Sequence, residues 1–204
     1  MACEILLSSA YLPPVEYFAH ILNAAEVFIE REENYLKQSY RNRCYILSPQ
    51  GPQLLTVPVY LGSFHKTPVK DIKIDYSKRW QQIHLRALTA SYSSSPYFLY
   101  YFESIEKIIQ TRYRYLLDLN LDLLQSILKI IKIEIRISYT TEFSPVEKKQ
   151  GDFRYSISPK KVSNYLCKNY LQVFNSELGF VPGLSIVDLV FNTGPEAVNY
   201  LHGT

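Results

Sequence analysis

The sequence predicts an α/β protein with an N-terminal βαβ unit, a mixed sheet, a β-hairpin and several packed helices. Two short apolar runs flank a helical pattern near the N-terminus, and two further apolar runs flank a turn rich in proline and glycine. Three apolar stripes with helical spacing follow. A chain of 204 residues with 47% hydrophobic and 20% charged residues is typical of a folded domain.

The first predicted unit is strand, helix, strand. Residues 4–8 form a short apolar run, and Pro13 and Pro14 suit the first turn of a helix, where the missing N–H groups have no partner anyway. Apolar residues then recur at helical spacing, and the run EVFIE (26–30) is predicted to be the second strand. Because one helix connects the two strands, we expect them to pair in parallel.

A hairpin and a further short strand are predicted next. Residues 43–47 and 54–59 flank the segment SPQGPQ, whose proline and glycine residues indicate a turn. In the segment DIKID (71–75), Ile72 and Ile74 alternate with charged residues, as in a short strand.

Three helices follow, and then a strand. Ser95 is expected to cap the second helix, with Pro96 at its first position. Alternation from Ile133 to Tyr139 predicts a strand with one exposed face. The apolar faces of the three helices are predicted to contain Trp80, Ile83, His84, Ala87, Leu88 and Ser91, then Phe98, Tyr101, Phe102, Ile105, Ile108 and Ile109, then Leu117, Leu121, Leu124, Leu128 and Ile131.

The whole chain is predicted to be a single domain in three parts. An α/β body covers residues 1–139, a polar loop covers 140–164, and a helical C-terminal segment (165–204) packs on the body. In that last part, Ser185 is expected to cap a helix that stops at the Gly194–Pro195 pair, where a new helix begins.

Composition narrows the setting in which this chain works. A net charge of +3 is too small for general nucleic-acid binding. The three cysteines are far apart and form no pattern of disulfides, which favours a reducing compartment. We find no signal peptide and no apolar run near the roughly 20 residues of a membrane helix, so we expect a cytoplasmic protein without membrane insertion. The oligomeric state stays open.

A basic segment is the strongest candidate for a site. The segments that follow the two predicted parallel strands, SSAYLPP and REENYLKQSYRNR, should meet at the carboxyl edge of the sheet, where ligands of such sheets bind. The start of the first helix would add free N–H donors for an anion. Lys37, Arg41 and Arg43 would then hold a phosphate or carboxylate, with Tyr11 and Asn42 beside them.

The basic segment also has a purely structural interpretation, which stays open. Glu30, Glu32 and Glu33 precede it and would neutralise its arginines in a surface network. In an extended segment, Arg41 and Arg43 would face one side and Asn42 the other.

Other candidate residues carry weaker signals. His84 shares a helical face with Trp80 and Leu88, so it is either a satisfied core histidine or a group that transfers protons. Asp188 and Asn192, four residues apart, are a second candidate set, although helix-end roles also explain them.

P-loop, dinucleotide-binding and nucleophile-elbow motifs are absent, and no motif in the sequence indicates a particular cofactor. No metal site is predicted, because none of the four histidines stands at a metal-ligand spacing: His20, His65, His84 and His202.

Several ordered motifs resemble the WbqC-like protein family. They are YLPPVEYFAHILNAAEVFIEREENYLKQSYRNRCYI, LTVPV, WQQIHLRALTASYSSSPYFLYY, LLDLN and YLQVFNSELGFVPGLSIVDLVFNTGPEAVNYL. The resemblance implies a link with O-antigen and other surface-polysaccharide gene clusters, without a settled reaction. The C-terminal half looks shorter than in longer relatives, which puts any site residue from that half in doubt. The positions that match the family are Tyr11, Pro13, Lys37, Asn42, Arg43, Trp80, His84, Asp188 and Asn192.

Two functions from different classes follow. The first is a cytoplasmic enzyme of surface-polysaccharide or nucleotide-sugar metabolism, of transferase or ligase type, acting on an anionic small molecule such as a sugar phosphate, a nucleotide sugar or a carboxylate. Nucleotidyl transfer is a weaker variant, since the loop after the first strand lacks a His-x-Gly-His motif. The alternative is a non-catalytic binding or scaffold protein of a glycan-assembly complex, with a partner surface made of Tyr97, Tyr100, Tyr113 and Tyr115.

Overall fold

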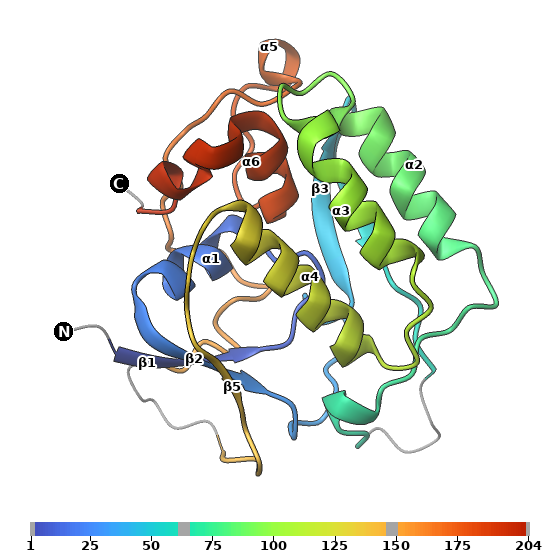
Figure 1. Cartoon of the computed structure of the whole chain (residues 1–204), viewed down its shortest axis with the longest axis vertical. Helices are drawn as coiled ribbons and strands as arrows, with labels where there is room; N and C mark the ends of the chain where they lie inside the picture. Colours follow the sequence, from blue (N-terminus) through green and yellow to red (C-terminus); the bar gives the residue numbers. More distant parts are fainter. Residues whose placement is uncertain (1–2, 61–65, 146–150, 203–204) are drawn as a thin grey trace.

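The computed structural model describes residues 3–60, 66–145 and 151–202. It has the α/β class that the sequence predicts, with a parallel sheet, an antiparallel hairpin and helices packed around both (Figure 1). His65, one of the four histidines considered above, lies outside the described residues.

The parallel sheet has the strand order β1-β2-β5. β1 spans Cys3–Ser8, β2 spans Ala24–Glu30 and β5 spans Ile137–Tyr139. β1 and β2 pair in parallel and are connected by α1 (Val15–Leu22), which confirms the predicted βαβ unit. The helix begins one residue later than expected, so that Pro14 is its N-cap. Because all three strands run in the same direction, their carboxyl ends lie at one edge of the sheet.

The predicted hairpin is present, with a tighter turn. β3 spans Arg43–Ser48 and β4 spans Gly51–Thr56, so only Pro49 and Gln50 lie between the strands. Gly51 has a φ of +104°, a backbone geometry that glycine reaches without steric cost. This glycine lets the chain reverse at once, and Pro52 therefore lies inside β4 and not in the turn.

The three predicted helices are α2 (Trp80–Tyr92), α3 (Phe98–Gln110) and α4 (Leu116–Ile130). In Figure 1, α2 and α3 lie side by side on the side of the molecule away from β1, and α4 crosses in front of the hairpin. Their apolar faces supply much of the core that lies between the hairpin and the parallel sheet.

Two details of these helices differ from the prediction. Ile83 is 58% exposed, whereas His84 next to it is 2% exposed, so the buried face of α2 is rotated away from Ile83. Ser95 does not cap α3. Its hydroxyl donates to the carbonyl of Tyr92 at the end of α2, and α3 begins after Tyr97.

The expected strand at 71–75 is replaced by a short 3-10 helix, η1 (Val69–Asp71), followed by extended chain. Ile72 and Ile74 are buried, as their alternation predicts, but the segment pairs only through two isolated bridges, Ile74 with Val59 and Lys73 with Tyr115. The apolar positions are therefore correct, and the continuous backbone pairing of a strand is missing.

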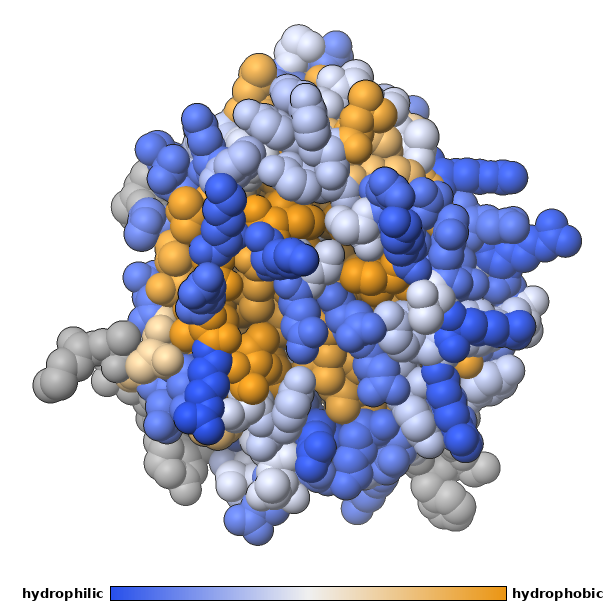
Figure 2. Space-filling model, viewed as in Figure 1, coloured by the Kyte–Doolittle hydropathy of each residue, from blue (hydrophilic) through white to orange (hydrophobic). Residues whose placement is uncertain are grey.

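β5 is shorter than the alternating pattern from Ile133 to Tyr139. Only its last three residues pair with β2, while Ile133 and Ile135 lie half-buried beside the end of α4. Figure 2 shows apolar side chains gathered on this face of the molecule and interrupted by hydrophilic ones.

Residues 151–157 are not the exposed loop that their polar composition predicts. The N–H of Leu6 in β1 donates to the carbonyl of Gly151 at 2.8 Å, and the N–H of Phe153 donates to the carbonyl of Leu6 at 2.9 Å. This stretch therefore continues the sheet beyond β1. Arg154, the residue after Phe153, is only 2% exposed.

We expect the substitution Gly151→Ala to loosen this attachment. Gly151 has a φ of +97°, and a Cβ there would lie 2.7 Å from the backbone oxygen of Glu4. Gly51→Ala is a matched control, because its φ is +104° and a Cβ would meet nothing within 4 Å.

The comparison is made on thermal midpoints. A left-handed backbone costs a side chain about 1–2 kcal/mol in both variants, and the backbone contact adds about 1–3 kcal/mol in Gly151→Ala alone. Equal midpoints for the two variants would show that residues 151–153 do not lie against β1 in solution.

The C-terminal segment contains α5 (Asn175–Leu178), α6 (Ile186–Thr193) and a 3-10 helix, η2 (Gly194–Tyr200). The Ser185 side chain accepts a hydrogen bond from the N–H of Val187, which confirms it as the N-cap of α6. The helix also stops at the glycine–proline pair, as predicted. α6 packs against α1, α3 and β3.

Candidate functional site

Two loops leave the carboxyl edge of the parallel sheet and are joined to each other. The first leads from β1 to α1, the second leads from β2 to β3, and the N–H of Tyr11 donates to the carbonyl of Tyr40 at 2.8 Å. The buried Leu12 has a φ of 41°, which is uncommon for a residue with a side chain. Its carbonyl accepts a hydrogen bond from the Ser185 hydroxyl at 2.7 Å. The C-terminal segment thus fixes the first loop.

Arg41 is fully engaged by a neighbouring acid. Its Nε donates to Oε1 of Glu33 at 2.8 Å and its second terminal nitrogen donates to Oε2 at 2.6 Å. Arg41 is 2% exposed and Glu33 is fully buried. Burial raises the pKa of Glu33, and the bidentate guanidinium offsets part of that rise. Arg41 is therefore paired with an acid, as the structural interpretation expects, but in a buried pair and not in a surface network.

A second arginine completes this buried ionic network. Arg154 donates to Oε2 of Glu30 at 2.8 Å and, through Nε and its other terminal nitrogen, to both oxygens of Asp152. Glu30 also accepts a hydrogen bond from the Thr140 hydroxyl at 2.7 Å. These contacts attach residues 152–154 to the end of β2, so the network belongs to the architecture of the sheet edge.

Two buried amides lie next to the arginine loop. Asn42 donates from Nδ2 to the carbonyl of Val57 at 2.9 Å, and Asn120 on α4 donates from Nδ2 to the carbonyl of Arg41 and to the hydroxyl of Ser9, both at 2.8 Å. The Oδ1 atoms of both amides are buried and have no hydrogen-bond partner. A buried acceptor without a partner costs about 1–3 kcal/mol.

Arg43 and Lys37 have a different environment from Arg41. Arg43 lies on the half-exposed face of β3 together with Tyr45, opposite Asn42. It forms no ion pair with a described carboxylate, and its Nε is buried without a hydrogen-bond partner. Burial raises the pKa of Tyr35 to about 12, and the charge of Arg43 opposes that rise, so Tyr35 lies beside it. Lys37 is exposed on the same loop.

His84 belongs to a buried aromatic cluster. Its Nδ1 and the Tyr11 hydroxyl are 2.8 Å apart, the Trp80 ring lies 5.2 Å away, and the carbonyl of Thr56 also hydrogen-bonds the imidazole. Burial lowers the pKa of His84 to about 4, so the ring is neutral at pH 7. The structure therefore brings Tyr11, Trp80 and His84 together, on the inner side of the hairpin, and places Arg43 on the other face of β3.

The second candidate set lies elsewhere. Asp188 is fully buried and accepts hydrogen bonds from the Tyr170 hydroxyl at 2.6 Å and the Gln172 amide at 2.9 Å, and the Tyr92 hydroxyl also hydrogen-bonds it. Burial raises the pKa of this carboxyl. It fastens the C-terminal segment to α6 and has no open side for a ligand.

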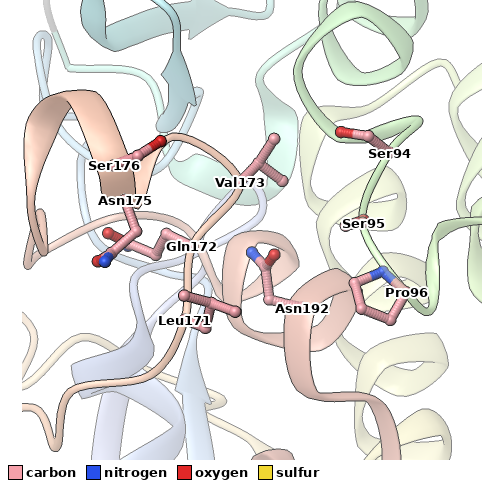
Figure 3. Close-up of a pocket in the computed structure, with 9 residues that line it drawn as sticks. All are labelled: Ser94, Ser95, Pro96, Leu171, Gln172, Val173, Asn175, Ser176 and Asn192. Atoms are coloured by element: carbon pink, nitrogen blue, oxygen red, sulfur yellow. The ribbon is translucent and has the colours of Figure 1, made fainter.

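Asn192, one helical turn further on, lines a surface cavity. Its Nδ2 donates to the Asp188 carbonyl at 2.7 Å. Figure 3 shows its amide facing the space between residues 171–176 and the turn at 94–96, and that cavity has a volume of about 420 Å³. Asp188 and Asn192 therefore do not act on one ligand from a common face.

Sequence reasoning did not identify two buried polar residues at the sheet edge, Asn120 and Arg154. It placed Glu33 on the surface, whereas Glu33 is the buried partner of Arg41. Asn120 carried a usable signal, because it is an amide at a buried position of the apolar stripe of α4. Arg154 gave no such signal, because the polar segment around it has the composition of an exposed loop.

Potential metal ligands do not cluster in the described part of the chain, and two of its three thiols, those of Cys44 and Cys167, are buried or half-buried. No three His, Cys, Asp or Glu side chains gather there as a metal-binding group. Burial raises the pKa of the Cys44 thiol far above its usual range and that of Cys167 to about 11, so neither is an activated nucleophile.

Among the described helices, none has the length and apolar character needed to cross a membrane.

Comparisons with known proteins give one family and one curated relative. The profile of the WbqC-like protein family matches residues 8–166. The uncharacterized protein Rv1507c of Mycobacterium tuberculosis (strain ATCC 25618 / H37Rv) is 28% identical over 226 aligned residues, which cover 96% of this chain and 96% of the relative. No solved structure matches the chain significantly.

Proposed function

The chain belongs to the WbqC-like protein family, and from this premise we propose that it is an enzyme of surface-polysaccharide or nucleotide-sugar metabolism. In this proposal it transfers or condenses a group onto an anionic, sugar-linked substrate. The link between the family and surface-polysaccharide genes supports the class of substrate.

The state of Arg43 carries the proposal. Of the two arginines in the basic segment, Arg41 is neutralised by Glu33, while Arg43 has no described acidic partner and a buried, unpartnered Nε. A half-buried guanidinium without a counter-charge is a strong site for a phosphate or carboxylate, which it binds through two parallel hydrogen bonds. Lys37, exposed on the loop before β3, adds a second positive charge. Arg41 is not part of this anion site.

Tyr11, Asn42 and His84 are buried on the inner face of β3, opposite Arg43, so the proposal gives them a supporting role behind the anion site. The imidazole of His84 is neutral at pH 7, because burial lowers its pKa to about 4, and both of its nitrogens have partners in the Tyr11 hydroxyl and the Thr56 carbonyl. This pair therefore holds the loop after β1 against α2 and is not placed to take a proton from a ligand at Arg43. Asn42 joins the start of β3 to the chain after β4, because its Nδ2 donates to the carbonyl of Val57 at 2.9 Å.

We expect Arg43→Ala to weaken binding of the ligand and to preserve the fold. Hydrogen bonds to a charged group contribute about 1.5–3 kcal/mol, so the dissociation constant should rise roughly 10- to 100-fold. The measurement is a thermal-shift screen against nucleotides, nucleotide sugars and acidic sugars. A ligand at 100 times its dissociation constant adds about 2.7 kcal/mol, which raises the midpoint of a chain of this length by roughly 5–10 °C.

The control is Arg86→Ala, which removes an exposed positive charge from α2. It should respond to the same ligand as the wild type does. If no compound shifts the wild type and Arg43→Ala alone melts early, Arg43 is structural and the anion site does not exist.

The alternative, a non-catalytic scaffold, has one specific observation in its favour. Leu99 and Tyr100 are neighbours on α3 and are 86% and 76% exposed. The four-tyrosine surface expected from the sequence does not form as such, because Tyr97, Tyr113 and Tyr115 are half-buried. A scaffold predicts that Leu99→Ser with Tyr100→Ser abolishes glycan assembly while every small-ligand affinity stays unchanged.

A further inference from the structure

A cavity of about 540 Å³ lies between the first turn of α1 and the C-terminal segment that crosses it. Glu16 lines it from α1, Tyr40 from the loop before β3, Lys161 from the end of the polar loop, and Tyr165 and Phe180 from the C-terminal segment. A second cavity of about 420 Å³ shares Glu16, Lys161 and Tyr165 with the first. Together they form a groove of the size that small-molecule sites have, roughly 300–1,000 Å³.

The polar lining of the groove requires a ligand that both donates and accepts hydrogen bonds. The Glu16 carboxylate only accepts, the Lys161 ammonium only donates, and the Tyr40 hydroxyl does either. Glu16 makes one distant ionic contact, to His20 at 3.8 Å, and no described group hydrogen-bonds the Tyr40 hydroxyl. A simple anion would be repelled by Glu16, whereas hydroxyl groups satisfy all three side chains.

The apolar lining points to the same kind of ligand. The rings of Tyr40, Tyr165 and Phe180 border the cavity, and Val15 and Pro182 add aliphatic surface. Apolar walls with a few convergent polar groups fit a flat ring that carries hydroxyls on its rim. A sugar ring has this distribution of apolar faces and polar edges.

The groove lies close to the anion site proposed above, because Tyr40, which lines it, stands three residues before Arg43 in the chain. Gly183 also lines the cavity, and the N–H of Ser185, two residues later, donates to the carbonyl of Tyr45 in β3 at 2.8 Å. Tyr45 and Arg43 are two residues apart on the same face of β3, a separation of about 7 Å. Tyr40 and the Gly183–Ser185 segment therefore connect the groove to the strand that carries Arg43.

We propose that this groove is the sugar subsite of a glycosyl-phosphate substrate whose phosphate is bound at Arg43. The inference rests on the proposed function, because it takes Arg43 as the anion-binding residue. It adds the place of the sugar, with Glu16 and Tyr40 as the residues that recognise its hydroxyls. Lys161 covers the sugar from the solvent side.

The test compares nucleotide sugars with the same nucleotides lacking the sugar. Isothermal titration would measure UDP-glucose, UDP-N-acetylglucosamine, GDP-mannose and dTDP-glucose, each against its free nucleoside diphosphate. We expect at least one nucleotide sugar to bind tenfold or more tightly than its free nucleotide. Glu16→Gln should remove at least fivefold of that advantage and leave the affinity for the free nucleotide unchanged.

Three further variants complete the design. Tyr40→Phe should also reduce the sugar advantage, and it retains the ring in case Glu16→Gln folds poorly. Glu103→Gln removes an exposed carboxylate from α3 and should change nothing. Arg43→Ala should weaken both members of each pair equally.

The outcomes separate the subsite from the anion site. If sugar and free nucleotide bind equally, or if Glu16→Gln and Tyr40→Phe leave their ratio unchanged, the subsite is wrong and the anion site stands. If Arg43→Ala leaves every affinity unchanged, Arg43 does not bind the anion and the proposed function is wrong, whatever the sugar comparison shows. If no member of any pair binds the wild type, both proposals fall.

Discussion

Arg154→Ala should lower the thermal midpoint by roughly 6–20 °C. Arg154 is 1% exposed in its ion pairs with Glu30 and Asp152, whose side chains are 1% and 9% exposed. Removal of one partner from a buried ion pair costs about 3–5 kcal/mol, because the remaining charge is left without compensation. Each kcal/mol moves the midpoint of a chain of this length by about 2–4 °C. Two carboxylates lose their partner here, so the loss should lie at the upper end.

Arg136→Ala is the matched control for this prediction. Arg136 pairs with Glu26 at 3.2 Å but is 78% exposed, and an exposed ion pair contributes about 0–1 kcal/mol. Both variants remove one positive charge, so a difference between their midpoints reports burial and not net charge. Similar midpoints would mean that water reaches Arg154 and that the segment around it is not part of the core.

His84 should make the folded state sensitive to acid between pH 6.5 and pH 4. Burial lowers the pKa of His84 in the folded chain from 6.5 to about 4, whereas the unfolded chain keeps the ordinary value. Between these two values the unfolded state binds the proton and the folded state does not. The contribution of His84 is therefore complete above pH 6.5 and is lost as the pH falls through about 4, to a total of about 3 kcal/mol.

His84→Gln isolates this contribution. Other groups titrate in the same range, and burial raises the pKa values of Glu33 and Asp188, which acts in the opposite direction. Urea unfolding at several pH values from 7.5 to 4 gives the free energy of unfolding for both proteins. The difference at pH 7.5 measures lost packing, and its change toward pH 4 measures titration. A difference that stays constant with pH would show that His84 is protonated in the folded protein as readily as in water.

Some functional expectations depended on which way a side chain points. Alternation along an extended segment correctly separated Asn42 from Arg43, because successive side chains of a strand face opposite sides. The same rule paired Arg41 with Arg43, and that was wrong. Arg41 precedes the first residue of β3, so it is free of the alternation and turns toward Glu33.

The sequence by itself determined the βαβ unit, the hairpin, the three helices and the cap of α6. These features depend on apolar spacing and on turn and cap residues that lie within a few positions of one another, so the local sequence is enough to predict them. Only the tertiary structure decided which charged side chains form ion pairs and which have no acidic partner. Glu30 and Arg154 lie 124 positions apart, and Glu33 reaches Arg41 but leaves Arg43 without a partner. Ion pairing depends on distances in space, and those are set by how the distant segments pack.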